Sequence, residues 1–222
     1  RMAKLTRSTA PDIDGITSID LKQGMKPHTV QILCNLMSDN KAPPEIMKIL
    51  TGYRMSFFTK PTTRENGSFR PIGPQSILYR IIGASHVAQY TLQHIHAVSK
   101  YQQAIGTKNG LETISNHISA DMEKHSENHI TLCFDISNGF GAVSREEVWK
   151  TIKDSEMLEH LKGIFRAAYG QENTVQFRLN DKNVLTKMSE GLIQGDPLSS
   201  LLFCILFGPI LNDTNAHSDD RD

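Results

Sequence analysis

Residues 190–203 bring together several residue types that can bind another molecule. Gly191 and Gly195 permit backbone conformations with positive φ and the close approach of a second molecule. Asp196, which a proline follows, can cap the start of a helix, and apolar residues then recur at helical spacing. A turn that contains Gln194 and leads into a helix anchored in the core suits the binding of something flat or anionic.

Asp135 is a second candidate, because it comes at the end of the apolar run 130–136. This run predicts a buried strand, and an aspartate at the end of such a strand can bind a divalent metal ion. Two-metal sites hold two such ions about 3.5–4 Å apart, with carboxylates among their ligands. Taken alone, an aspartate that only ends a strand and caps the next turn is the more frequent case. The metal-binding interpretation therefore depends on the neighbouring motifs.

Basic residues gather between positions 48 and 80, where Glu65 is the only acidic residue. Such a local excess of positive charge can neutralise phosphates, although the chain as a whole has zero net charge. A solvated basic face is the alternative interpretation. The basic residues of this window are Lys48, Arg54, Lys60, Arg64, Arg70 and Arg80.

Four segments resemble motifs of reverse transcriptases, especially those of non-LTR (LINE-like) retrotransposons. Residues 191–203 resemble Gly-x-x-Gln-Gly-x-Pro-x-Ser-x-x-Leu-Phe, and residues 135–143 resemble Asp-x-x-Asn-Ala-Phe-x-x-Val. Segments 58–61 and 69–72 resemble the fingers motifs, and segment 8–16 resembles the signature Ala-Pro-Gly-x-Asp-Gly-Ile. The four occur in the family's order and cover nearly the whole chain, which makes the resemblance specific.

The resemblance implies a metal site. Asp135 would bind both metal ions, expected to be Mg²⁺, and the backbone carbonyl of Ile136 would contribute to the same site. The family's other carboxylates belong to a Tyr-x-Asp-Asp motif between apolar strands. The acidic pair within residues 217–220 has polar neighbours that cannot form such strands, which predicts a polar tail. We therefore expect the chain to stop before its own active site is complete.

The same resemblance implies contacts with the nucleotide. Lys60 and Arg70 would hold the triphosphate, since arginine offers a planar fork of donors and lysine a point charge. Phe140 would stack under the incoming sugar and exclude a 2′-hydroxyl, although an ordinary core aromatic is the alternative. Gln194 would pack near the sugar and base, and Gly195 would allow the nucleotide or template-primer to approach closely.

Apolar periodicity and turn signals predict an α+β fold in which β-hairpins pack against helices. The resemblance implies the fingers and incomplete palm of a right-hand polymerase, with a fingers-like region at 1–128 and a partial palm at 129–222. A turn at residues 66–67 would bring Lys60 and Arg70 together on one hairpin. The predicted helices cover 27–39, 44–50, 75–98 and 110–125. Three further helices are expected: one that the Ser144–Glu147 capping box opens, one that ends at Gly170 and one that begins at Pro197. The predicted strands cover 53–59, 69–72, 130–136, 175–179 and 184–188.

The composition is that of a globular protein, with 38% hydrophobic and 22% charged residues among 222. Cys34, Cys133 and Cys204 lie in apolar segments, so they are expected to be reduced core thiols of an intracellular protein. No pair of cysteines has the spacing of metal ligands, and neither a signal peptide nor a membrane span is visible. A nuclear location is expected if the element is eukaryotic.

The resemblance implies an RNA-directed DNA polymerase, a nucleotidyltransferase that adds dNTPs to a DNA primer on an RNA template. We expect the full-length protein to be active and this fragment alone to be inactive. A decayed or domesticated nucleic-acid-binding remnant is the alternative, because the third palm motif is missing and Gly139 and Gly141 stand where the family more often has Ala and Asn. A bacterial or organellar intron-type reverse transcriptase is a third interpretation.

Overall fold

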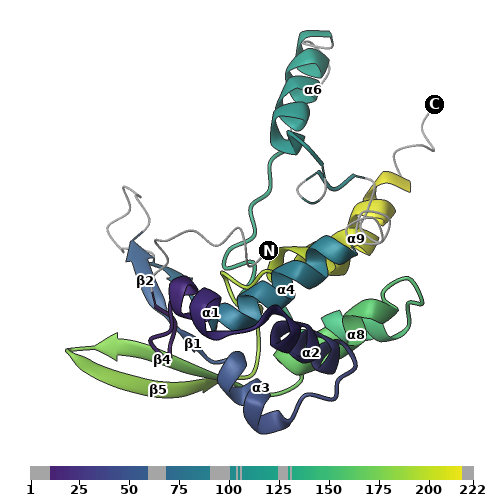
Figure 1. The fold of residues 1–222 in the computed structure, drawn as a ribbon. Helices are drawn as coiled ribbons and strands as arrows, with labels where there is room; N and C mark the ends of the chain where they lie inside the picture. The colour runs from purple at the N-terminus through teal and green to yellow at the C-terminus, as the bar shows by residue number, and fades with distance from the viewer. Residues whose placement is uncertain are drawn as a thin grey trace.

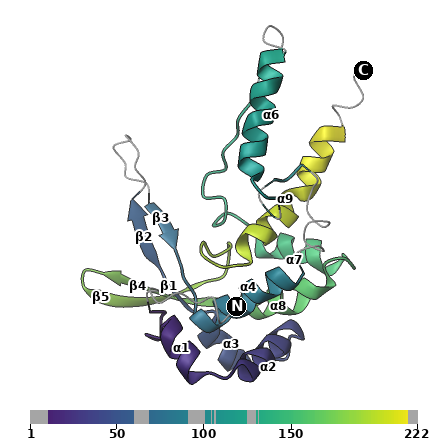
Figure 2. The ribbon, with the colours of Figure 1, turned by 45° about the horizontal axis from the view of Figure 1, so that its top comes forward.

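The computed structural model describes residues 11–59, 69–90, 101–103, 105, 107–124, 130 and 132–216. Helices and two small sheets form a mixed α and β body, from which one helix projects (Figures 1 and 2). The helices are α1 (Ser18–Gly24), α2 (Pro27–Ser38), α3 (Pro44–Leu50), α4 (Ile77–Gln89), α6 (Gly110–Lys124), α7 (Arg145–Lys153), α8 (Glu159–Tyr169) and α9 (Ser199–Ala216). The strands are β1 (Tyr53–Arg54), β2 (Ser56–Thr59), β3 (Phe69–Ile72), β4 (Asn173–Leu179) and β5 (Lys182–Met188).

Local signals placed most of the helices correctly. Helices α2 and α3 start at prolines, whose fixed φ suits the first helical turn, and both match the predicted segments. Ser144 caps α7 by accepting a hydrogen bond from the Glu147 amide, and α8 ends at Gly170, as predicted. Helix α4 covers residues 77–89 of the predicted segment 75–98, and residues 91–100 lie outside the described part of the chain.

The predicted strand 53–59 is interrupted, and its two halves belong to different sheets. Tyr53 pairs in parallel with Val175, whereas Phe58 in β2 pairs antiparallel with Arg70 in β3. The chain leaves the first sheet at Met55, whose amide donates to the Gln176 carbonyl at 2.7 Å. One continuous strand is therefore wrong, but the predicted pairing with 69–72 is confirmed. The predicted turn at residues 66–67 lies outside the described residues.

The β4–β5 hairpin confirms the prediction for residues 175–188. Asn180 and Asp181 both have positive φ, at 47° and 61°, which is the combination that a tight two-residue hairpin turn requires. The strands β1, β4 and β5 form one sheet in that order. The β2–β3 hairpin rises at a steep angle beside it (Figure 2).

The core lies mainly among the helices, and Tyr53 and Val175 are the buried hydrophobic residues that the first sheet adds to it. Helix α9 supplies Leu201, Leu202 and Ile205, all at most 2% exposed, and Leu198 precedes them on the same buried side. This confirms the apolar helix face predicted after Asp196. Other buried members of the core are Met37, Tyr53, Tyr79, Ile82, Val148, Ile152, Leu161, Ile164 and Val175.

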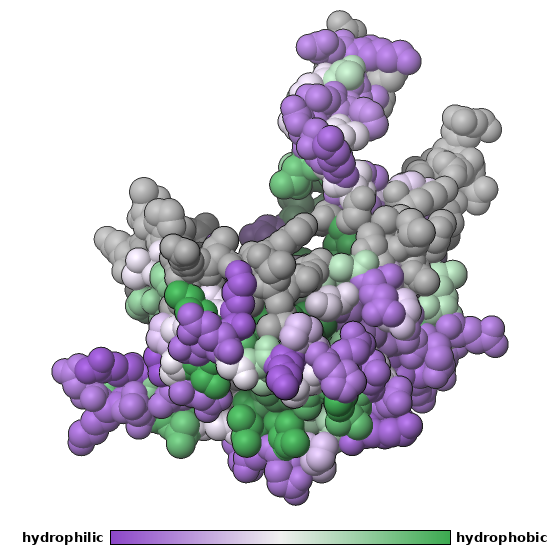
Figure 3. All heavy atoms as spheres, viewed as in Figure 1, coloured by the Kyte–Doolittle hydropathy of each residue, from purple (hydrophilic) through white to green (hydrophobic). Residues whose placement is uncertain are grey.

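Helix α6 exists as predicted, but its apolar residues are not covered by the described chain. It extends away from the body in both views, and hydrophilic side chains predominate on the face shown in Figure 3. Leu111 and Met122 are 80% and 53% exposed, and Ile114 and Ile118 are also exposed. The prediction of an amphipathic helix is right, whereas packing of its apolar stripe is not seen among the described residues.

The predicted buried strand at 130–136 is wrong. The described residues of this segment have no regular secondary structure, and its alternating apolar side chains are exposed, from 48% at Ile136 to 88% at Phe134. A strand needs a neighbour for its backbone groups, and none of the described strands pairs with this segment. The apolar alternation is present, but the partner strand is not in the described part of the chain.

The cysteines are free thiols with different surroundings. Cys34 and Cys204 are half-buried against the core, and burial raises the pKa of both thiols. Cys133 is exposed, so its assignment as a core thiol is wrong, because the strand that would have buried it does not form. None of the described helices is long and apolar enough to cross a membrane.

Candidate nucleotide-binding site

A cleft of about 1090 Å³ brings together five of the seven residues that the motifs single out. Arg70, Asp135, Ile136, Phe140 and Gln194 all line it. They come from β3, from the segment that leads into α7 and from the turn before α9, which are far apart in sequence. Of the other two, Gly195 is exposed and does not line the cleft, and Lys60 lies outside the described residues.

Backbone hydrogen bonds join the motif at residues 135–143 directly to the motif at residues 191–203. The Leu192 amide donates to the Phe140 carbonyl at 2.8 Å, and the Gly191 amide donates to the Val143 carbonyl at 3.1 Å. Gly191 has φ of +77°, and a Cβ there would lie 2.7 Å from the carbonyl oxygen of Gly141. Only glycine permits both the conformation and this approach, so Gly191 sets how closely the two motifs meet.

Phe140 is half-buried at the floor of the cleft. Its ring packs edge-on against Phe203 of α9, with ring centroids 5.5 Å apart and planes at 72°. Its backbone carbonyl is fixed by the bond to Leu192 described above. The ring is therefore held from the core side while one part of it borders the cleft, which fits both the predicted sugar contact and an ordinary packing role.

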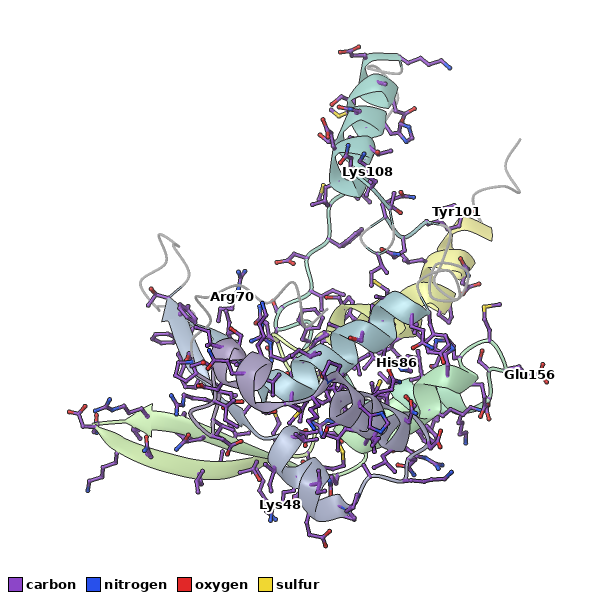
Figure 4. All side chains as sticks on the ribbon, viewed as in Figure 1. Lys48, Arg70, His86, Tyr101, Lys108 and Glu156 are labelled. Atoms are coloured by element: carbon purple, nitrogen blue, oxygen red, sulfur yellow. The ribbon has the colours of Figure 1, made fainter. Side chains whose placement is uncertain are left out.

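Arg70, on β3, is another residue that lines the cleft. It lies on β3 across from Phe58, and its side chain is exposed (Figure 4). Phe69, which precedes Arg70 on the strand and is 58% exposed, also lines the cleft. A guanidinium at this position can contact a phosphate group through its planar fork of donors.

The Gln194 turn forms the third side. The Gln194 carbonyl accepts a hydrogen bond from the Gly73 amide at 2.9 Å, which ties the turn to the end of β3. Gly195 has φ of +115°, as its position in the motif predicted, and a Cβ there would meet Gly73 only at 3.5 Å. Conformation rather than space therefore requires a glycine at position 195.

Asp196 does more than the helix capping predicted for it. Its Oδ1 accepts from the Leu198 amide at 2.8 Å, although α9 itself begins at Ser199 rather than at the proline. It is also buried, and it accepts hydrogen bonds from the hydroxyls of Tyr79 and Tyr169. Burial raises the pKa of the Asp196 carboxyl, and the hydrogen bonds only partly offset that effect.

Arg145 is a buried guanidinium that sequence reasoning missed. Its Nε donates to the Gly191 carbonyl at 2.9 Å, and its Nη2 donates to Asn173 Oδ1 at 2.8 Å. Its Nη1 donates to the Gln171 carbonyl, and the guanidinium lies 5.0 Å from the centre of the Tyr169 ring. In the sequence this arginine is only the first residue of a helix, so nothing local indicates that it supports a turn 46 residues away.

The described residues do not by themselves complete a two-metal site. Asp135 is exposed in an irregular segment, and Glu190 is the other acidic residue that lines the cleft. Among the described residues, no three His, Cys, Asp or Glu side chains come close enough together to hold a metal ion. Asp135 can supply a carboxylate, but the donor set around it is too small for a pair of ions.

The arrangement of a basic hairpin, an aspartate segment and a glycine-rich turn around one cleft suits a nucleotidyltransferase. The family model for reverse transcriptase (RNA-dependent DNA polymerase) matches residues 58–220. That match covers most of the chain, so the chain belongs to the reverse transcriptase family, whose activity is RNA-directed DNA synthesis. No curated protein matches the chain.

Proposed function

We propose that this chain forms the fingers (1–128) and the first part of the palm (129–222) of a non-LTR retrotransposon reverse transcriptase. The full-length enzyme would add dNTPs to a DNA primer on an RNA template, in the nucleus of a eukaryotic host. The observation that most supports the proposal is the cleft that Arg70, Asp135, Phe140 and Gln194 share. Membership of the reverse transcriptase family supports the general activity, and the non-LTR assignment rests on the motifs.

The residues that line the cleft would bind different parts of the nucleotide. Arg70, together with Lys60, would bind the triphosphate through charge-assisted hydrogen bonds. Phe140 would lie against the sugar and disfavour a 2′-hydroxyl, and Gln194 would contact the sugar and base. Reverse transcriptases use divalent metal ions, and Asp135, with the carbonyl of Ile136, would contribute ligands for Mg²⁺; the remaining carboxylates are not among the described residues.

Primer extension with the complete gene product tests the proposal. The assay uses an RNA template, a DNA primer, Mg²⁺ and dNTPs, and compares the wild type with Asp135→Ala and with Asp154→Ala. Asp154 is an exposed residue at the end of α7, away from the cleft, so it controls for the loss of an acidic residue. We expect the wild type and Asp154→Ala to extend the primer, and Asp135→Ala to lose about a thousandfold or more in rate. Normal extension by Asp135→Ala would contradict the proposed role of this aspartate.

A nucleic-acid-binding remnant without catalysis is the second candidate. It is favoured by one observation, namely that the segment carrying Asp135 is exposed and unpaired with any described strand. The same preparation distinguishes the two candidates. If the wild type binds a labelled RNA–DNA hybrid in a mobility-shift assay but extends no primer, the remnant is supported and the polymerase proposal fails for this protein.

A further inference from the structure

A buried hydrogen-bond network lies under the Gln194 turn and connects it to two tyrosines on different helices. The Tyr79 hydroxyl of α4 lies 3.2 and 3.0 Å from the two carboxylate oxygens of Asp196. The Tyr169 hydroxyl of α8 donates to Asp196 Oδ2. Asp196 and both tyrosines are at most 7% exposed, so these bonds form in a low-dielectric interior where they are strong and their loss is costly.

The network continues to the backbone just before Gln194. The Ile193 amide donates to the Tyr169 hydroxyl at 3.4 Å, and the Ser199 hydroxyl donates to the Ile193 carbonyl at 2.8 Å. The oxygens of Tyr169 and Ser199 are themselves 3.0 Å apart. The amide and the carbonyl of Ile193 are thus both hydrogen-bonded to buried hydroxyls. Asp196, two residues after Gln194, is hydrogen-bonded to the two tyrosines.

Two further contacts restrain the turn from other sides. The Gly73 amide binds the Gln194 carbonyl, and Arg145 binds the Gly191 carbonyl while its guanidinium lies over the Tyr169 ring. The turn contains Gly191 and Gly195, both at positive φ, and glycine otherwise allows many conformations. Its single conformation therefore depends on these restraints rather than on its own backbone preference.

We infer that Asp196, Tyr79 and Tyr169 are positioning residues that hold the Gln194 turn in the conformation that receives the incoming nucleotide. None of the three lines the cleft, so their effect passes through Gln194. The inference rests on the proposed function. It adds to that function a specific set of residues that affect the affinity for the nucleotide without contacting it. Ser199 belongs to the same network, because it connects Tyr169 to the backbone of the turn.

The test compares Tyr79→Phe and Tyr169→Phe with Tyr90→Phe in the complete gene product. Each change removes one hydroxyl and keeps the ring. Tyr90 stacks on His160 and packs at a tilted angle against His86, away from the cleft. Steady-state primer extension gives kcat and the KM for dNTP, and hydrogen exchange reports on the amides of residues 191–198. The loss of a hydrogen bond to a buried charged group corresponds to about tenfold or more in an equilibrium.

We expect Tyr169→Phe and Tyr79→Phe to raise the KM for dNTP about tenfold, to change kcat by less than about threefold, and to speed exchange within residues 191–198. Tyr90→Phe should match the wild type in all three measurements. A KM and an exchange pattern equal to those of the wild type in both network variants would overturn the inference.

The two readouts separate this inference from the proposed function. If the wild type extends no primer, the proposed function fails, and hydrogen exchange alone then decides whether the network holds the turn. If Tyr169→Phe does not fold, Tyr79→Phe carries the test, because among the described contacts its hydroxyl binds only Asp196. A lower kcat with unchanged KM and unchanged exchange would also contradict the inference, since it would place the tyrosines outside nucleotide binding.

Discussion

Two segments that border the same cleft differ in how the chain supports them. The turn at residues 190–199 is held by hydrogen bonds to residues of α4, α7 and α8 and to Gly73 just after β3. The segment at residues 132–136, which carries Asp135, is exposed along its length and pairs with no described strand. Both segments belong to motifs that resemble those of one enzyme family, yet only the first is built into the body.

The difference shows that a motif adopts its structure only where its partners are also present. The helices that hold the turn, α4, α7 and α8, all lie within the described residues. The apolar alternation of Ile130, Leu132, Phe134 and Ile136 is suited to a strand buried on one side, and helix α6 presents an equally uncovered apolar stripe. Three experiments test this difference between the two segments.

The largest contrast is expected from two leucine-to-alanine changes. Leu202, on α9 behind the turn, is fully buried, whereas Leu132 is 71% exposed. Leu202→Ala should lower the free energy of unfolding by about 3 kcal/mol, because it leaves a cavity in the core. Leu132→Ala should change it by less than about 0.5 kcal/mol. Urea unfolding of the 222-residue chain, followed by fluorescence of its single tryptophan, Trp149, gives both values. Equal losses would mean that residues 130–136 are packed after all.

A smaller contrast is expected from two glycines. Gly191 has positive φ and would place a Cβ 2.7 Å from the Gly141 carbonyl, so Gly191→Ala should cost about 2–4 kcal/mol. Gly139 has no such conformation, and a Cβ there would meet Phe203 at 3.4 Å. Gly139→Ala should therefore change stability by less than about 1 kcal/mol in either direction. The same unfolding experiment measures both, and a tolerated Gly191→Ala would show that the turn is less restrained than we describe.

The smallest effect is a change in the pH dependence of stability. Burial raises the pKa of the Asp196 carboxyl above its ordinary value of 3.8 in the folded protein. The ionised carboxylate therefore costs stability: the cost is absent below 3.8, grows as the pH rises through the raised folded-state pKa, and is complete above it. Asp196→Asn carries no charge, so its stability relative to the wild type should improve as the pH rises from about 3.5 to about 7.

Unfolding measured at several pH values checks that slope. Asp154→Asn, at an exposed position, is the matched control and should follow the wild-type profile. If Asp196→Asn and the wild type run in parallel over the whole range, the carboxyl is not titrating as a buried acid. A gain in stability together with a higher KM for dNTP would show that the buried aspartate is retained for positioning.

The sequence predicts those features of the fold that interactions between nearby residues determine. The prolines at the starts of α2 and α3, the Ser144 cap and the Asn180–Asp181 turn each act within a few residues, and the helices and strands that they begin or connect were predicted. Sequence reasoning missed what depends on distant partners. The bond between Tyr79 and Asp196 spans 117 positions, and neither residue type indicates the other. The break at Met55 and the unpaired segment at 130–136 likewise depend on which strands are available as neighbours.

Hydrogen exchange of the 222-residue chain, with residues 132–136 and 191–199 followed in one experiment, tests the central comparison most directly. We expect the amides of Gly191, Leu192 and Leu198, which are hydrogen-bonded inside the body, to exchange slowly. The amides of residues 132–136 should exchange at nearly the rate of an unstructured peptide. Strong protection of residues 132–136 would show the opposite, namely that the Asp135 segment is already a paired strand.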